Sequence, residues 1–174
     1  LSLTIFGALK ISTIDSVPSN RKDIITLLIH EQRRQEIIDR IDKIFKQGEQ
    51  VFWVCPLIET DTNMQKQAAT SIAAELIKRL GKSKIGLLHG KLENTEKEKI
   101  MKSFVNREID LLVATTVIEV GIDVPNATLI IIDGPENMGL VQLHQLRGRV
   151  GRGYKQGFCI LLYGKNLTDN GKKK

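Results

Sequence analysis

Apolar runs of β-rich composition alternate with segments of helical periodicity along the chain, and this alternation constrains the fold more than any other feature. The candidate strands are DIITLLI (23–29), VFWVCPLI (51–58), KIGLLH (84–89), IDLLVAT (109–115), ATLIIID (127–133) and GFCILLY (157–163). The segments with helical spacing between them cover residues 30–48, 63–80, 94–105 and 138–149. Strands that alternate with helices in this way predict an α/β domain with a mostly parallel central sheet flanked by helices.

Local signals mark the ends of two of these helices. Apolar residues recur at helical spacing in the first helix, and Gly48 supplies a stop. In the segment 94–105, Thr95 and Glu98 have the spacing of a capping box, in which two side chains satisfy backbone N–H groups of the first turn. Both signals agree with the predicted helices.

The length of 174 residues fits one domain of ordinary size. Residues 1–20 show weak periodicity and are interpreted as a linker arm that leads into a single domain over residues 21–174. No apolar run is long enough to span a membrane, and the first residues lack the features of a signal peptide. Cys55 and Cys159 lie in apolar runs without the spacing of a metal site, which predicts core thiols of a cytoplasmic protein and no metal centre.

The net charge of +6 suits a nucleic-acid partner, although part of the excess comes from the terminal GKKK. Aromatic residues make up only 5% of the chain. This scarcity argues against a single-strand binding fold that stacks bases on aromatic faces.

Two segments imitate parts of a nucleotide site. GKS (81–83) resembles the end of a P-loop, but the required glycine five places earlier is Leu76, so Gly81 is better interpreted as a helix C-cap. Asp133 ends an apolar strand, as a magnesium-binding aspartate does. Without a P-loop, the simpler interpretation is an aspartate that caps the following turn. The chain therefore lacks the usual means of cradling a triphosphate.

The stretch QLHQLRGRVGRG (142–153) interleaves three arginines, Arg147, Arg149 and Arg152, with three glycines. Arginines grip phosphate, and glycines let another surface approach closely. Without its own P-loop, such a stretch can act in trans as an arginine finger on a nucleotide bound elsewhere. On a helix or tight helical turn, the spacing of Arg149 and Arg152 would place both on the same side. A solvated basic turn is the alternative interpretation.

Three segments, taken together, carry a resemblance to a known family. QLRGRVGR (145–152) resembles motif VI of superfamily-two helicases, LLVATTVIEVGIDVP (111–125) resembles their motif V, and VFWVCPLIE (51–59) resembles motif IV. The finer match, which includes LLHGKL and GLVQLHQLRGRVGRG, is to the RecG family of bacterial ATP-dependent DNA helicases. The transcription-repair coupling factor family is the nearest alternative, since it shares QLHQLRGRVGR.

The resemblance implies a RecA-like three-layer fold and the second motor domain of a DNA helicase. It implies replication-fork reversal, branch migration and DNA recombination or repair on branched or double-stranded DNA, by a monomer in the bacterial cytoplasm. It also implies that ATP with Mg is bound mainly by an upstream RecA-like domain, with a wedge domain further upstream. A fragment that only binds DNA, without enzymatic activity, is the alternative from another class.

Site residues follow from the resemblance position by position. The catalytic finger residues are Arg149 and Arg152. The nucleotide-binding residues are Gln145, Gly121 and Asp123. The DNA-binding residues are Thr115, Thr116, Gly90 and Lys91. The roles of Arg147 and Glu119 stay open, and His89 is expected to be a structural loop histidine.

Overall fold

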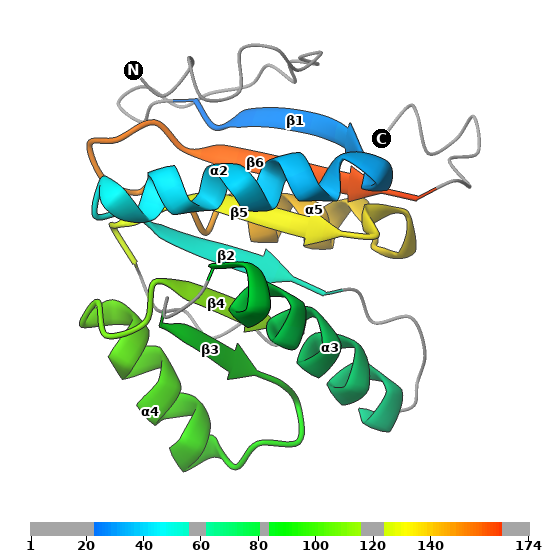
Figure 1. Ribbon diagram of the computed structural model, residues 1–174, viewed down its shortest axis with the longest axis vertical. Helices are drawn as coiled ribbons and strands as arrows, with labels where there is room; N and C mark the ends of the chain where they lie inside the picture. Colours follow the sequence, from blue (N-terminus) through cyan, green and yellow to red (C-terminus); the bar gives the residue numbers. More distant parts are fainter. Residues whose placement is uncertain (1–22, 56–61, 81–83, 116–123, 165–174) are drawn as a thin grey trace.

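The computed structural model describes residues 23–55, 62–80, 84–115 and 124–164, and these form a six-stranded sheet whose strand pairs are all parallel (Figure 1). The order across the sheet is β1-β6-β5-β2-β4-β3. The strands are β1 (Ile25–His30), β2 (Gln50–Val54), β3 (Ile85–Leu88), β4 (Leu111–Ala114), β5 (Ala127–Asp133) and β6 (Phe158–Tyr163). The predicted α/β fold with a parallel central sheet is confirmed.

Helices cover both faces of the sheet and complete three layers. The helices are α2 (Arg34–Lys46), α3 (Thr62–Leu80), α4 (Asn94–Val105) and α5 (Leu140–Arg147), with short 3-10 turns η1 (Glu31–Arg33) and η2 (Pro135–Asn137). In Figure 1, α2 and α3 lie in front of the sheet and α5 lies behind it.

Two hydrophobic cores separate these layers. Buried side chains of α2 and α3 pack with Trp53 of β2 on one face, and those of α4 and α5 pack with the neighbouring Phe52 on the other. Strands β2, β4 and β5 are buried along their whole length. Successive residues of a strand point to opposite faces, so strands covered on both sides are mostly apolar at odd and even positions alike.

Both cysteines are free and buried, as expected for core thiols. Burial raises the pKa of the Cys55 and Cys159 thiols to about 12. Within the described parts of the chain, no helix is both long and apolar enough to cross a membrane.

Several predicted boundaries differ from the structure. The first predicted helix is divided into η1 and α2, and Gly48 follows α2 with a φ of 69°, as a stop signal requires. The predicted capping box at Thr95 and Glu98 is wrong, because the helix already begins at Asn94. Glu93 is the N-cap residue, and its N–H donates to Glu96 Oε2 at 3.3 Å.

The other differences concern the ends of β2 and α5. Strand β2 ends at Val54, and residues 56–58 of the predicted strand lie outside the described residues. The helix predicted over 138–149 spans only Leu140–Arg147, since Gly139 and Gly148 bound it. The linker arm (1–20) and the C-cap at Gly81 lie outside the described residues.

Candidate functional site

The arginine-rich stretch covers the end of α5 and the turn that follows it. The helix ends at Arg147, with Gly148 as its C-cap. The N–H of Arg149 donates to the carbonyl of Leu146 at 3.0 Å, which continues a tight helical turn past the cap. Gly151 then adopts a φ of 68°, a left-handed conformation that suits glycine and ends the turn.

The two candidate finger residues stand on either side of this break. Arg152 folds back, and its Nε donates to the carbonyl oxygen of Gly148 at 2.9 Å, where a cation is favoured by the helix C-terminus. Arg149 is half-buried, and Val150 between the two arginines is anchored in the core. Helical spacing therefore does not describe this pair, because Gly151 interrupts the turn.

The arginine turn, defined here as Gly148–Gly153, lies at the edge of the sheet where the strands begin. The N–H of Gly151 donates to the carbonyl of Ala127, the first residue of β5, at 3.3 Å. A Cβ placed on Gly153 would lie 2.7 Å from the carbonyl oxygen of Pro125, directly ahead of β5. The turn is thus in backbone contact with the chain that enters the sheet after motif V.

The predicted DNA-binding residues that the structure describes lie at the opposite, carboxyl edge. Thr115 follows β4; its N–H donates to the carbonyl of Leu88 at 3.0 Å, and its side chain is fully buried. The hydroxyl of Thr115 has no hydrogen-bond partner among the described residues. Gly90 and Lys91 follow β3 and are exposed, while His89 is buried beside them.

Four of the residues singled out from the sequence lie outside the described residues, namely Thr116, Glu119, Gly121 and Asp123. Gln145, the other predicted nucleotide-binding residue, lies on α5 and is exposed. Its position is two residues before the end of the helix, close in sequence to the arginine turn.

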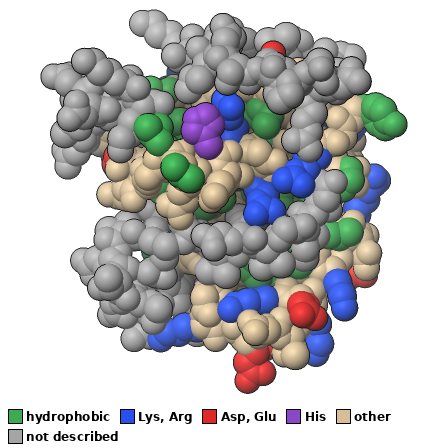
Figure 2. Space-filling view, turned by 180° about the vertical axis from the view of Figure 1, so that it is seen from behind, with side chains coloured by type: hydrophobic (Ala, Val, Ile, Leu, Met, Phe, Trp, Pro, Cys, Tyr) green, Lys and Arg blue, Asp and Glu red, His purple; other side chains and the backbone are tan. Residues whose placement is uncertain are grey.

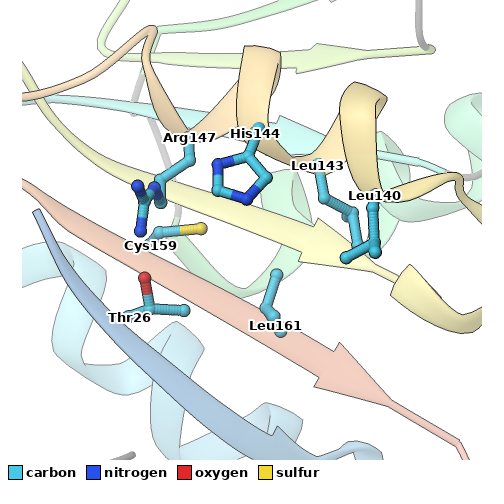
Figure 3. A pocket seen from close by; sticks show the side chains of 7 residues that line it. All are labelled: Thr26, Leu140, Leu143, His144, Arg147, Cys159 and Leu161. Carbon is cyan, nitrogen blue, oxygen red and sulfur yellow. The ribbon is translucent and has the colours of Figure 1, made fainter. Parts of the chain in front are cut away.

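Arg147 has a different environment from the other two arginines. It points into an open pocket between α5 and the strands β1 and β6, beside His144 (Figure 3). The lining is mostly apolar and consists of Thr26, Leu140, Leu143, His144, Arg147, Cys159 and Leu161. Figure 2, which views the molecule from behind, shows Lys and Arg side chains gathered in the middle of the face opposite to α2 and α3.

The carboxyl edge also contains an ion pair that no sequence motif indicates. Arg34 Nη2 lies 2.8 Å from Asp133 Oδ1 and 2.7 Å from Asp133 Oδ2, and Trp53 Nε1 donates to Oδ2 at 3.4 Å. The guanidinium also lies over the Trp53 ring, 5.5 Å from its centre. The prediction that Asp133 caps the following turn is wrong, because Arg34, 99 residues away in sequence, occupies both carboxylate oxygens.

Burial sets the protonation behaviour of this cluster. It raises the pKa of the Asp133 carboxyl, and the charge of Arg34 opposes this effect. The Asp133 charge also contributes to the raised pKa of the nearby Cys55 thiol, after burial. The cluster is an internal tie between α2, β2 and β5.

The donors at the site fit an anion and not a cation. No group of three His, Cys, Asp or Glu side chains in the described ranges could hold a metal ion. The arginine turn instead offers guanidinium groups, whose N–H donors match phosphate oxygens. A nucleotide phosphate fits these residues, and the ion that accompanies it would need ligands from elsewhere.

Comparison with known proteins agrees with this geometry. Residues 35–154 match the family described as helicase conserved C-terminal domain. The chain is 50% identical over 164 residues to ATP-dependent DNA helicase RecG of Pasteurella multocida, covering 94% of this chain and 24% of that protein. It is 48% identical over 169 residues to RecG of Escherichia coli K12, covering 97% and 24%. The chain thus spans about a quarter of the length of these relatives.

Solved structures show the same fold. RecG bound to a three-way DNA junction has a TM-score of 0.77 at 40% identity, over 91% of this chain and 20% of that one. The DUF1998 helicase MrfA bound to DNA has a TM-score of 0.63 at 15% identity, over 84% and 20%, which is a likeness of fold alone.

Proposed function

Because the chain belongs to the helicase conserved C-terminal domain family, we propose that it is the second RecA-like motor domain of an ATP-dependent DNA helicase of the RecG type. One observation carries this proposal. The arginine turn lies at the amino edge of the sheet, whereas Thr115, Gly90 and Lys91 lie at its carboxyl edge. One domain can therefore present positive charge to a nucleotide phosphate at one edge and contact DNA at the other.

At the amino edge, Arg152 and Arg149 supply the positive charge that stabilises phosphoryl transfer at a neighbouring domain. An arginine finger of this kind raises the rate about 10³–10⁵-fold. Its rigid N–H fork suits the spread-out charge of the phosphoryl group. Gln145, Gly121 and Asp123 contribute contacts to the nucleotide or couple it to the finger.

ATP, when bound with Mg, supplies the phosphoanhydride bond whose hydrolysis drives movement. The sequence contains no P-loop, and the described residues contain no cluster of metal ligands. We therefore assign the binding of ATP and Mg to an upstream RecA-like domain. This division of labour predicts that the 174-residue chain does not hydrolyse ATP alone.

At the carboxyl edge, Thr115, Thr116, Gly90 and Lys91 contact the DNA backbone. A hydroxyl, a backbone N–H and a lysine address phosphate and not base edges, so binding is independent of sequence. This suits a motor that steps along any duplex. The relative whose structure holds a three-way junction supports branched DNA as the substrate. Fork reversal and branch migration in the bacterial cytoplasm are the corresponding activities, carried out by a monomer with a separate wedge domain.

The decisive experiment replaces Arg152 with alanine in the complete protein that contains this domain. We expect DNA-stimulated ATP hydrolysis to fall about 10³-fold or more, with DNA affinity nearly unchanged. Arg79→Ala, an exposed arginine at the end of α3, serves as the control and should keep full activity. Near-normal turnover in Arg152→Ala would refute the finger role.

The absence of a P-loop from the sequence also favours a second candidate, a module that binds DNA without catalysis. ATP hydrolysis by the complete protein distinguishes the two candidates. ATP turnover that depends on Arg152 supports the motor, and a complete protein that binds DNA but never hydrolyses ATP supports the module.

A further inference from the structure

Gly153 and Pro125 are in backbone contact at the amino edge of the sheet. A Cβ on Gly153 would lie 2.7 Å from the Pro125 carbonyl oxygen and 3.8 Å from its Cβ. Side chains do not come that close to a backbone oxygen without one of the two moving. The contact therefore requires glycine for space, and φ strain is not the reason, since Gly153 has no positive φ.

The arginine side of this contact cannot easily retreat. A Cβ on Gly151 would lie 3.1 Å from the Cα of Gly157, and the Gly151 N–H is bonded to the sheet at Ala127. Beyond the turn, Lys155 Nζ forms an ion pair with Glu49 Oε1 at 2.9 Å. These contacts hold the turn on both sides of Arg152.

The Pro125 side is held equally well. Val124 is buried in the core, and its carbonyl accepts from the N–H of Ala127 at 3.0 Å. The neighbouring Asn126 accepts at its carbonyl from the N–H of Gln50 at 2.9 Å, and at its side chain from Arg107 Nη2 at 2.7 Å. Two fixed segments thus meet at one point where only a hydrogen atom fits.

We propose that Gly153 is a positioning residue that sets the place of the arginine turn against the chain entering β5. Pro125 lies two residues before β5, and Gly153 directly follows Arg152 in sequence. The position of the Arg152 backbone is therefore set by contact of one backbone with another, without a flexible side chain between them. This inference rests on the proposed function and adds to it the contact that positions the finger.

The test uses Gly153→Ala in the complete protein and measures ATP hydrolysis against duplex DNA concentration. The added methyl group forces the two backbones apart, so the stimulated rate should fall about tenfold or more, because small misplacements of catalytic groups are costly. The DNA concentration for half-maximal stimulation should stay within twofold. A purely structural role would instead change both quantities or the melting temperature.

Two glycines provide matched controls. Gly139→Ala meets no atom within 4 Å and should behave as wild type. Gly86→Ala in β3 would place its Cβ 2.8 Å from Ile109 Cδ1, so it also introduces a close contact in the core, with the end of a side chain and far from the turn. If Gly86→Ala reduces stimulation as strongly as Gly153→Ala, crowding alone explains the effect and the inference fails.

Pro125→Gly changes the other residue of the contact and adds no atoms. It loosens the backbone that Gly153 touches, and it should also lower the stimulated rate. This variant decides the matter if Gly153→Ala does not fold, because full stimulation in Pro125→Gly overturns the inference. If DNA stimulates ATP hydrolysis by Gly153→Ala as it does in wild type while Arg152→Ala is inactive, the role of Gly153 is refuted and the proposed function stands. An active Arg152→Ala refutes the proposed function itself.

Discussion

Asp133, the last residue of β5, accepts a hydrogen bond from Arg34, the first residue of α2, at Oδ1 and forms an ion pair with it at Oδ2. The side chains are 12% and 24% exposed, respectively, so the pair is largely withdrawn from water. Trp53 completes the arrangement from β2, with its indole N–H on Asp133 and its ring under Arg34. Three elements far apart in sequence are thereby tied together at the carboxyl edge.

We expect Arg34→Met to lower the free energy of unfolding by about 3 kcal/mol, because it leaves the Asp133 carboxylate without its partner in a largely buried place. Urea unfolding of the 174-residue chain measures this. Glu36→Gln is the matched control: it breaks the exposed Arg33–Glu36 pair, which should cost less than about 1 kcal/mol. Equal losses in the two variants would show that burial of the Asp133 pair has no energetic consequence.

The same pair predicts a pH dependence. Burial raises the pKa of the Asp133 carboxyl, so the folded chain binds this proton more readily than the unfolded chain. The corresponding stability is fully present below the ordinary aspartate pKa of about 3.9 and is lost as pH rises through the raised value. The free energy of unfolding of wild type relative to Asp133→Asn should therefore decline across that window. A relative stability that rises with pH would mean that Arg34 outweighs burial.

Arg147 should be dispensable for ATP hydrolysis, because its side chain lines the pocket under α5 and does not belong to the arginine turn. We expect Arg147→Met, which keeps an apolar stem, to retain turnover within about threefold, whereas Arg149→Ala loses transition-state stabilisation of the arginine-finger kind. Steady-state ATPase assays of the complete protein compare the two. A loss in Arg147→Met as large as that in Arg149→Ala would place Arg147 among the finger residues.

DNA binding by the complete protein should weaken with salt as phosphate contacts predict. Lys91→Ala at the carboxyl edge should reduce the slope of log affinity against log salt by about one unit. Lys84, exposed just before β3 at the other edge, is the control, and Lys84→Ala should leave the slope unchanged. Fluorescence anisotropy across a salt series gives both slopes. A reduced slope in Lys84→Ala alone would place DNA at the amino edge instead.

The sequence by itself determined the layer architecture and the identity of the motifs. Strands such as ATLIIID read as buried on both faces because each contains apolar residues at odd and even positions, and β5 matches that segment residue for residue. Local sequence signals did not determine the helix ends. Gly148 stops α5 two residues earlier than its periodicity indicates, and Glu93 begins α4 ahead of the predicted cap. Local signals compete over one turn, and only packing decides between them.

Only the tertiary structure decided which residues meet. Nothing in the spacing of Arg34 and Asp133 relates them, since parallel strands return to the same edge only after long crossovers. The same topology places the arginine turn and Thr115 at opposite edges of the sheet and brings Gly153 onto Pro125. Sequence periodicity records which face of an element is buried, but not which distant element covers it. That choice depends on how the sheet order β1-β6-β5-β2-β4-β3 brings separate segments into contact.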